Sequence, residues 1–246
     1  MRILVWLEKA AVRFCHACVR LLLGNDGFLM RIWRRVLDLL WPRNCEICGR
    51  PVDREARYIC ADCLNRIPFV RPEDGMYEID DAASAVRFEC ETRKIINDYK
   101  FNSHIWLRDD FADWIEAAAR SRFDVSAIDA VVAIPTTLGH RLNRGYNQSA
   151  LLAESLAKRL DRRFLGSAVA RTGHPKRQSS LTEEERIENV KGTFAVREPS
   201  LVRGRTVLLV DDIMTTGSTL SECAKTLKAA GAWRVWSVTL ARSVRT

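Results

Sequence analysis

An acidic pair and a hydroxyl-rich loop near the C-terminus are the residues whose types and spacing best suggest a chemistry. Four apolar residues, 207–210, lead directly into this segment. A ribose has two adjacent hydroxyls, and two neighbouring carboxylates can accept their hydrogen bonds. A phosphate dianion suits backbone N–H groups, hydroxyls and the positive end of a helix dipole. We therefore predict a ribose-phosphate site made of Asp211, Asp212, Thr215, Thr216, Gly217, Ser218 and Thr219.

Other phosphate motifs do not compete with this interpretation. The loop lacks the Gly-Lys-Ser/Thr of a P-loop, and no GxGxxG follows a strand pattern. In the alternative interpretation, the acidic pair is a solvated strand end and Thr-Gly-Ser is a helix N-cap. The order of strand, acidic pair, loop and helix favours the ligand site.

Four cysteines form two CxxC pairs separated by eleven residues: Cys45, Cys48, Cys60 and Cys63. Each pair makes a tight turn, and Gly49 suits a turn that needs a positive φ. Two such turns supply the four thiolates that tetrahedral zinc prefers, so we predict a closed, structural zinc site. The alternative is two unrelated buried or redox-active pairs. Cys15 and Cys18 have the same spacing inside a helical pattern, where we expect apolar packing.

The elements that must position these residues alternate between strand and helix, which predicts an α/β fold with a parallel sheet and helices on both faces. We expect strands at 130–134, near 168–170, at 206–210 and at 235–240, and helices at 111–122, 149–160 and 220–230.

Three parts are predicted along the 246 residues: an amphipathic helical segment at 1–41, a zinc module at 42–70 and the α/β domain at 71–246. The net charge of +8 favours anionic partners, or it serves solubility alone. We see no segment long enough to span a membrane and no clear secretory signal, and we expect a cytoplasmic protein.

Residues 207–220 resemble the signature of type I phosphoribosyltransferases that binds phosphoribosyl pyrophosphate (PRPP). More narrowly, residues 36 to 242 are similar to the ComF family, which is linked to DNA uptake in natural competence. The paired cysteines carry this resemblance together with Tyr99-Lys100-Phe101, the block 144–148 (Arg-Gly-Tyr-Asn-Gln, with Tyr for the family's Phe) and the polar segment that begins at Arg171-Thr172.

The resemblance implies that Asp211 and Asp212 bind the ribose hydroxyls and that the loop 215–219 holds the 5′-phosphate. Thr136, Arg141 and Arg144 would then serve the diphosphate, with Mg²⁺ bound alongside PRPP. For each arginine the alternative is a surface charge. The segment 172–189 stands where the fold has a mobile flap, although an ordinary loop is the alternative.

Three functions follow from the resemblance. The first is a cytoplasmic role in DNA uptake, with single-stranded DNA and a helicase-like competence protein as partners. The second is a nucleotide-salvage phosphoribosyltransferase. The third is a PRPP-binding module without turnover. The sequence does not predict an oligomeric state.

Overall fold

The computed structural model describes residues 43–52, 57–70, 79–137, 145–172 and 190–243. The chain forms two compact units, Met1–Ala61 and Asp62–Thr246, whose boundary falls within the short helix α3 (Ala61–Leu64). The predicted helices at 1–41, together with Arg141, Arg144 and most of the segment 172–189, lie outside the described residues. None of the described helices has the length and apolar character needed to cross a bilayer.

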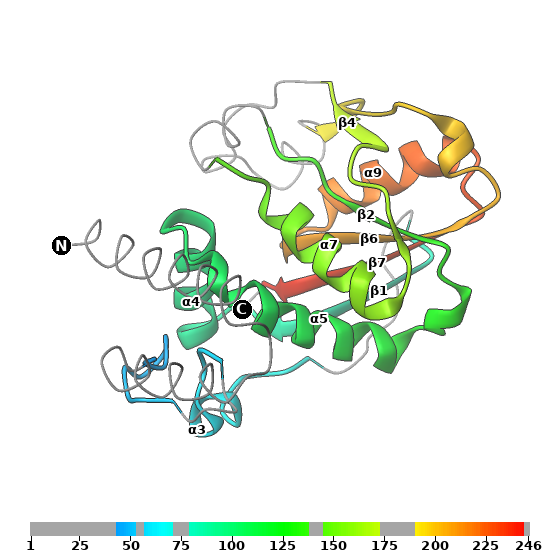
Figure 1. Ribbon diagram of the computed structural model, residues 1–246. Coiled ribbons are helices and arrows are strands. Elements are labelled where there is room, and N and C mark those ends of the chain that lie inside the picture. Colours follow the sequence, from blue (N-terminus) through cyan, green and yellow to red (C-terminus); the bar gives the residue numbers. More distant parts are fainter. Residues whose placement is uncertain (1–42, 53–56, 71–78, 138–144, 173–189, 244–246) are drawn as a thin grey trace, which may run out of the picture. The chain divides into compact units, whose positions relative to one another are not determined.

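A five-stranded parallel sheet forms the core of the second unit, as the sequence predicts (Figure 1). Its spatial order is β1-β7-β6-β2-β3, and every neighbouring pair is parallel. The central strands are nearly continuous apolar runs because helices cover both of their faces. The strands are β1 (Asp81–Arg87), β2 (Ala130–Ala133), β3 (Arg163–Phe164), β6 (Thr206–Met214) and β7 (Arg234–Arg242).

Helices cover the sheet on both sides (Figure 1). The main ones are α4 (Cys90–Phe101), α5 (Arg108–Arg122), α7 (Gln148–Leu160) and α9 (Ser218–Ala229). The alternation of side chains along β6 separates the two faces. Val207 and Leu209 join a core cluster with Leu220 and Cys223 of α9. Helices α5 and α7 pack together on the opposite face, where α7 also contacts β2 and β6.

The structure corrects the predicted elements in three places. Strand β6 continues past Val210 to Met214, because β7 is equally long and pairs with it as far as Met214↔Arg242. Strand β1 and helix α4 were not predicted from the sequence. The strand expected near residues 168–170 is β4 (Val169–Arg171), which lies outside the parallel sheet. It pairs antiparallel with β5 (Phe194–Val196), and the pairing continues with a hydrogen bond from Thr172 N to Thr193 O.

Candidate functional site

The acidic pair lies inside β6, near its carboxyl end. Because consecutive side chains of a strand leave on opposite faces, the two carboxylates have different surroundings. Asp212 is 9% exposed, and its Oδ1 accepts a hydrogen bond of 2.9 Å from Lys100 Nζ at the end of α4. The ion pair gives the buried Asp212 carboxylate a counter-charge from a distant part of the chain.

Asp211 is held by two donors on one oxygen. Its Oδ1 accepts from Ser149 Oγ at 2.8 Å and from the backbone N of Asp212 at 2.9 Å. Burial and then the negative charge of Asp212 raise the pKa of Asp211 above its usual range, while the two hydrogen bonds and the charge of Lys100 act in the opposite direction. The pair is therefore close enough for each charge to affect the other, although the strand directs the side chains to alternate faces.

This raised pKa predicts that the substitution Asp211→Asn stabilises the protein at neutral and higher pH. A carboxyl group whose pKa is higher in the folded than in the unfolded state loses folding stability as the pH rises between those two values. The asparagine side chain would keep an oxygen for both donors and would never ionise. We expect the free energy of unfolding of Asp211→Asn, minus that of the wild type, to be larger by about 2 kcal/mol at pH 8 than at pH 4, so that the stabilising effect appears as the pH rises. Urea unfolding at both pH values measures this difference, and an equal difference at the two would contradict the prediction.

Of the predicted phosphate loop 215–219, residues 215–217 connect β6 to α9, and Ser218 and Thr219 are the first two residues of α9. Gly217 is the N-cap residue of α9, with φ +77°, and it offers no side chain to cap the helix. The Thr216 and Ser218 hydroxyls lie 3.0 Å apart, and Thr216 Oγ1 accepts one long bond of 3.4 Å from Ser218 N. This long bond is the support that these residues give to the alternative interpretation, in which Thr-Gly-Ser caps the helix through a side chain. The backbone N–H groups of the first turn and the nearby hydroxyls are the groups that an anion needs at a helix N-terminus.

Thr136 lies at the same edge of the sheet. Thr136 follows β2, which pairs with β6 as far as Ala133↔Val210. The backbone N of Ile134, the residue after β2, donates to Val210 O and continues this pairing. Asn147 Nδ2 donates to Ile134 O at 3.1 Å, so the segment after β2 is bonded to the N-cap residue of α7. The structure therefore brings Thr136 and the acidic pair to the carboxyl ends of adjacent strands, where parallel α/β sheets bind ligands.

Two of the motifs behind the family resemblance interlock next to the acidic pair. Tyr146 Oη donates to Tyr99 O at 3.0 Å, and Gln148 Nε2 donates to Lys100 O at 3.0 Å. In return, Tyr99 Oη donates to Gln148 O at 3.2 Å. Tyr99 is fully buried and Gln148 is 2% exposed, so the bond from Tyr99 Oη to Gln148 O is shielded from water, and the other two bonds are partly buried. We call these three hydrogen bonds the Tyr99–Gln148 clasp, and it fixes the backbone that carries Lys100.

Sequence reasoning missed two residues that contact the acidic pair. Lys100 appeared only as part of a family motif, and no charge pattern pointed from α4 to β6. Ser149 is predictable only as the first residue of a helix, and nothing in its type indicates a bond to Asp211. Only the folded chain brings these residues together, across 112 and 62 positions of sequence.

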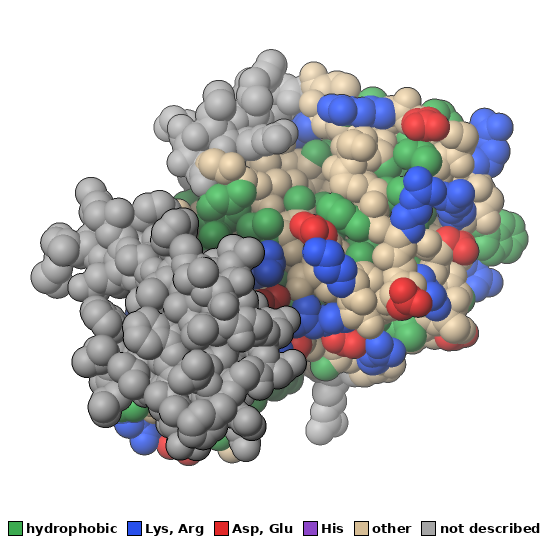
Figure 2. All heavy atoms as spheres, in the orientation of Figure 1, with side chains coloured by type: hydrophobic (Ala, Val, Ile, Leu, Met, Phe, Trp, Pro, Cys, Tyr) green, Lys and Arg blue, Asp and Glu red, His purple; other side chains and the backbone are tan. Residues whose placement is uncertain are grey.

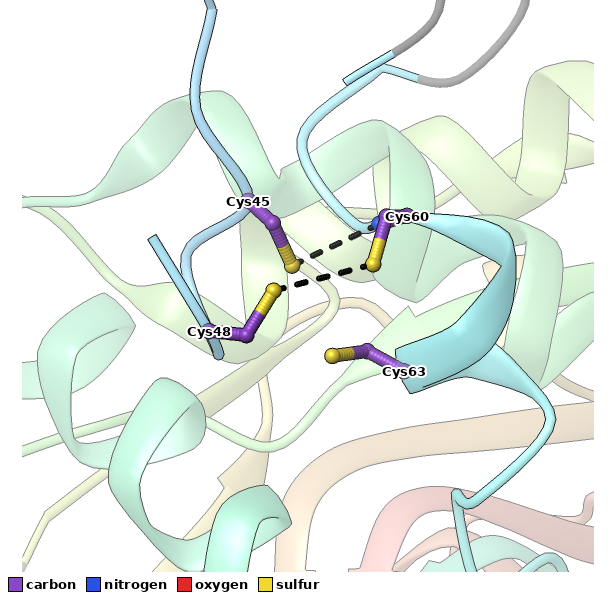
Figure 3. Close-up of side chains that lie close together, drawn as sticks. All are labelled: Cys45, Cys48, Cys60 and Cys63. Atoms are coloured by element: carbon purple, nitrogen blue, oxygen red, sulfur yellow. Dashed lines mark hydrogen bonds between the residues drawn. The ribbon is translucent and has the colours of Figure 1, made fainter. Parts of the chain in front are cut away.

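The four predicted zinc ligands lie together (Figure 3). The Sγ atoms of Cys45, Cys48, Cys60 and Cys63 are all within 4.8 Å of one another, and those of Cys48 and Cys60 are 3.8 Å apart. A regular tetrahedron with Zn–S bonds of about 2.3 Å places its sulfurs about 3.8 Å apart. The four thiolates thus fit a structural zinc ion. They would fill all four of its coordination positions and leave none open for a catalytic water.

Hydrogen bonds around the cysteines complete this arrangement. Gly49 has φ +75° and donates from its N to Cys45 O at 2.8 Å, which confirms the predicted turn. Cys60 N donates to Cys45 Sγ at 3.4 Å, and Arg66 Nη2 donates to Cys63 Sγ at 3.4 Å. Donors of this kind orient metal-bound thiolates and reduce their charge.

The basic side chains visible in Figure 2 are interspersed with acidic and apolar ones on the described part of that face. Both basic residues of α7 form ion pairs. Arg159 pairs with Asp113 and Glu116 of α5, and Lys158 pairs with Glu154.

Comparisons with known proteins agree with this architecture. The phosphoribosyl transferase domain family matches residues 147–245, and the double zinc ribbon domain family matches residues 36–73. Competence protein F of Haemophilus influenzae is 29% identical over 203 residues, which are 81% of this chain and 84% of that protein. The DNA utilization protein YhgH of Escherichia coli is 29% identical over 197 residues (78% and 82%). Competence protein ComFC of Bacillus subtilis is 27% identical over 241 residues (97% and 88%).

Proposed function

Because the chain belongs to the ComF family of competence proteins, we propose that it binds PRPP or a related ribose phosphate and acts in the cytoplasmic steps of DNA uptake. The family relationship supports the biological role, and the site at the end of β6 supports the ligand. We propose that the zinc ion has a structural role and stabilises the fold of the cysteine-bearing segment. Four cysteine ligands leave no coordination position for a substrate.

A single observation carries the ligand assignment. Two interacting carboxylates, Asp211 and Asp212, stand at the carboxyl end of a parallel strand and are followed by a hydroxyl-rich loop that opens a helix with glycine as its N-cap residue. The carboxylates would accept the ribose hydroxyls, and the loop 215–219 would hold the 5′-phosphate. Thr136 would face the diphosphate with Arg141 and Arg144, and Mg²⁺ would reduce the charge of the diphosphate.

A calorimetric titration of PRPP with Mg²⁺ tests this assignment. We expect binding to the wild type and at least a hundredfold weaker binding to the double variant Asp211→Asn/Asp212→Asn, because two charge-assisted hydrogen bonds to the ribose become neutral. The control is Asp161→Asn, which removes one charge from the exposed end of α7. Absence of PRPP binding to the wild type, or equal binding to the double variant, would refute the ligand assignment.

Turnover is tested with the same protein and ligand. A transferase would release pyrophosphate from PRPP when the right base is present, whereas a binding module would bind PRPP and release none. We propose PRPP binding, which both roles share. Pyrophosphate release with any nucleobase would assign the chain to nucleotide salvage, and PRPP binding without release would assign it to a binding module.

The proposed partners in DNA uptake are single-stranded DNA and a helicase-like competence protein. A strain that lacks this protein should take up DNA and integrate it less efficiently. Complementation with the Asp211→Asn/Asp212→Asn variant should fail if the ribose-phosphate site serves the uptake role. Normal transformation of the deletion strain would exclude the role, while leaving PRPP binding as a separate question.

A further inference from the structure

Arg171 carries an unused pair of hydrogen-bond donors in the interior. Its Nε and Nη2 atoms are buried and have no hydrogen-bond partner among the described residues. Arg171 is the last residue of β4 and pairs across the hairpin with Phe194 of β5. The guanidinium carbon lies 5.2 Å from the centre of the Phe194 ring. The guanidinium is therefore held against an aromatic ring while one of its edges makes no hydrogen bond.

An unused edge of this kind is costly in a folded protein. A buried donor without a partner loses its hydration and gains nothing in return, and the penalty is larger when the group is charged. Nε and Nη2 form one side of the guanidinium, and this side matches two oxygens of a single carboxylate or phosphate. The donors that lack partners are thus the two that an oxyanion would use together.

The surroundings of Arg171 connect it to the acidic pair. Burial lowers the pKa of Arg171, and the negative charge of Asp211 is the main influence that raises it again. Yet Asp211 Oδ1 already accepts from Ser149 and from the Asp212 amide, and Asp211 accepts no hydrogen bond from the Nε and Nη2 donors of Arg171. The electrostatic contact between the two side chains therefore leaves these donors unused.

The hairpin that carries Arg171 packs on the helix that follows the phosphate loop. Val169 of β4 and Phe194 of β5 belong to the same core cluster as Leu220 and Cys223 of α9. Arg171 accordingly lies on the face of β6 that α9 covers, and the side chain of Asp211 alternates toward this face. A ligand that occupies the acidic pair and the N-terminus of α9 would reach this face of the sheet.

We propose that Arg171 binds a phosphoryl group of the ribose-phosphate ligand through its Nε and Nη2 donors. This inference rests on the proposed function and adds a ligand-binding residue to it. The two donors stay without partners in the free protein and gain them only when the anion enters. The free protein consequently bears a stability penalty that the ligand relieves, and Arg171 discriminates against ligands that lack a phosphoryl group at this position.

Calorimetry and thermal unfolding of Arg171→Met and Arg171→Lys test the proposal. Methionine retains much of the stem and removes both donors, whereas lysine keeps the charge and loses the two-donor edge. We expect PRPP with Mg²⁺ to bind at least tenfold more weakly to both variants than to the wild type. Without ligand, Arg171→Met should unfold at the same temperature as the wild type or higher. Arg197→Gln is the control, because this exposed arginine directly follows β5 and its side chain makes no hydrogen bond with the described residues.

Ribose 5-phosphate and inorganic pyrophosphate, titrated separately, identify the phosphoryl group. The one whose binding Arg171→Met weakens is the group that Arg171 contacts. Unchanged PRPP affinity in Arg171→Met would overturn the inference and leave the proposed function standing. A lower unfolding temperature with unchanged affinity would overturn it as well, by making Arg171 a structural residue. If the wild type itself binds no PRPP, the proposed function fails first and the inference falls with it.

Discussion

Serine in place of Cys63 should eliminate the bound zinc ion and unfold the cysteine-bearing segment. Cys63 is 2% exposed, and its Sγ is one of four sulfurs within 4.8 Å of one another. A hydroxyl is a poor substitute for a thiolate at a site that selects soft ligands. Structural zinc provides about 10–16 kcal/mol of folding free energy in small metal-dependent modules, so the loss of one ligand removes more than such a segment can spare.

Elemental analysis and limited proteolysis measure both parts of this result. The wild type should contain one zinc ion per chain, and Cys63→Ser should contain far less and be cleaved rapidly between residues 43 and 70. Cys90→Ser is the matched control, because Cys90 is an exposed cysteine outside the cluster. Full zinc content in Cys63→Ser would mean that this cysteine is not a ligand, and loss of zinc in the control would point to a general folding defect.

The strongly patterned parts of the fold could be predicted from the sequence. The run 207–210 and the strand at 130–133 are apolar throughout because both faces of a central parallel strand are covered, and this pattern is readable without a structure. The doubled CxxC spacing determines its own geometry, since each pair spans one tight turn. The sequence therefore predicts the parallel sheet and the clustering of the four cysteines correctly.

Strand β1 shows where such reasoning fails. Its central residues, Ala83, Ser84 and Ala85, are small, so it lacks the β-branched run that marked the other strands. It forms because β7 provides a partner along its length, and the Ser84 and Thr239 hydroxyls bond across the pair at 2.7 Å. The end of β6 was underestimated for the same reason. Pairing with β7, rather than hydrophobicity, extends β6 through its two aspartates.

The candidate site was predictable where its residues adjoin in sequence and not where they meet across the fold. Asp211, Asp212 and the loop after them form one continuous segment, so their types and order were informative. Arg171 and Lys100 belong to other elements, and their approach to the acidic pair depends on how β4 and α4 pack. Charge pairing at long range leaves no local pattern, and this explains why these cations were missed.

Methionine in place of Lys100 should destabilise the protein by about 3 kcal/mol, because it leaves the Asp212 carboxylate buried without its counter-charge. The side chains of Lys100 and Asp212 are 15% and 12% exposed, and the Nζ–Oδ1 distance is 2.9 Å. Lys94→Met is the control on the same helix. Lys94 is 61% exposed and lies 3.6 Å from Asp98, so its loss should cost about 0.5 kcal/mol or less.

The double variant Lys100→Met/Asp212→Asn separates this ion pair from other contributions of the two side chains. Once residue 212 is neutral, the loss of Lys100 no longer leaves a buried charge without a partner. The double variant should therefore be about 2 kcal/mol more stable than the sum of the two single effects predicts. Urea unfolding of the four proteins gives the coupling free energy. Purely additive effects would mean that the ion pair contributes nothing.

The Tyr99–Gln148 clasp fixes the backbone of Lys100. We therefore expect Gln148→Leu to lower the coupling free energy between Lys100 and Asp212. This result would link two family motifs that are distant in the sequence to the charge balance of the acidic pair.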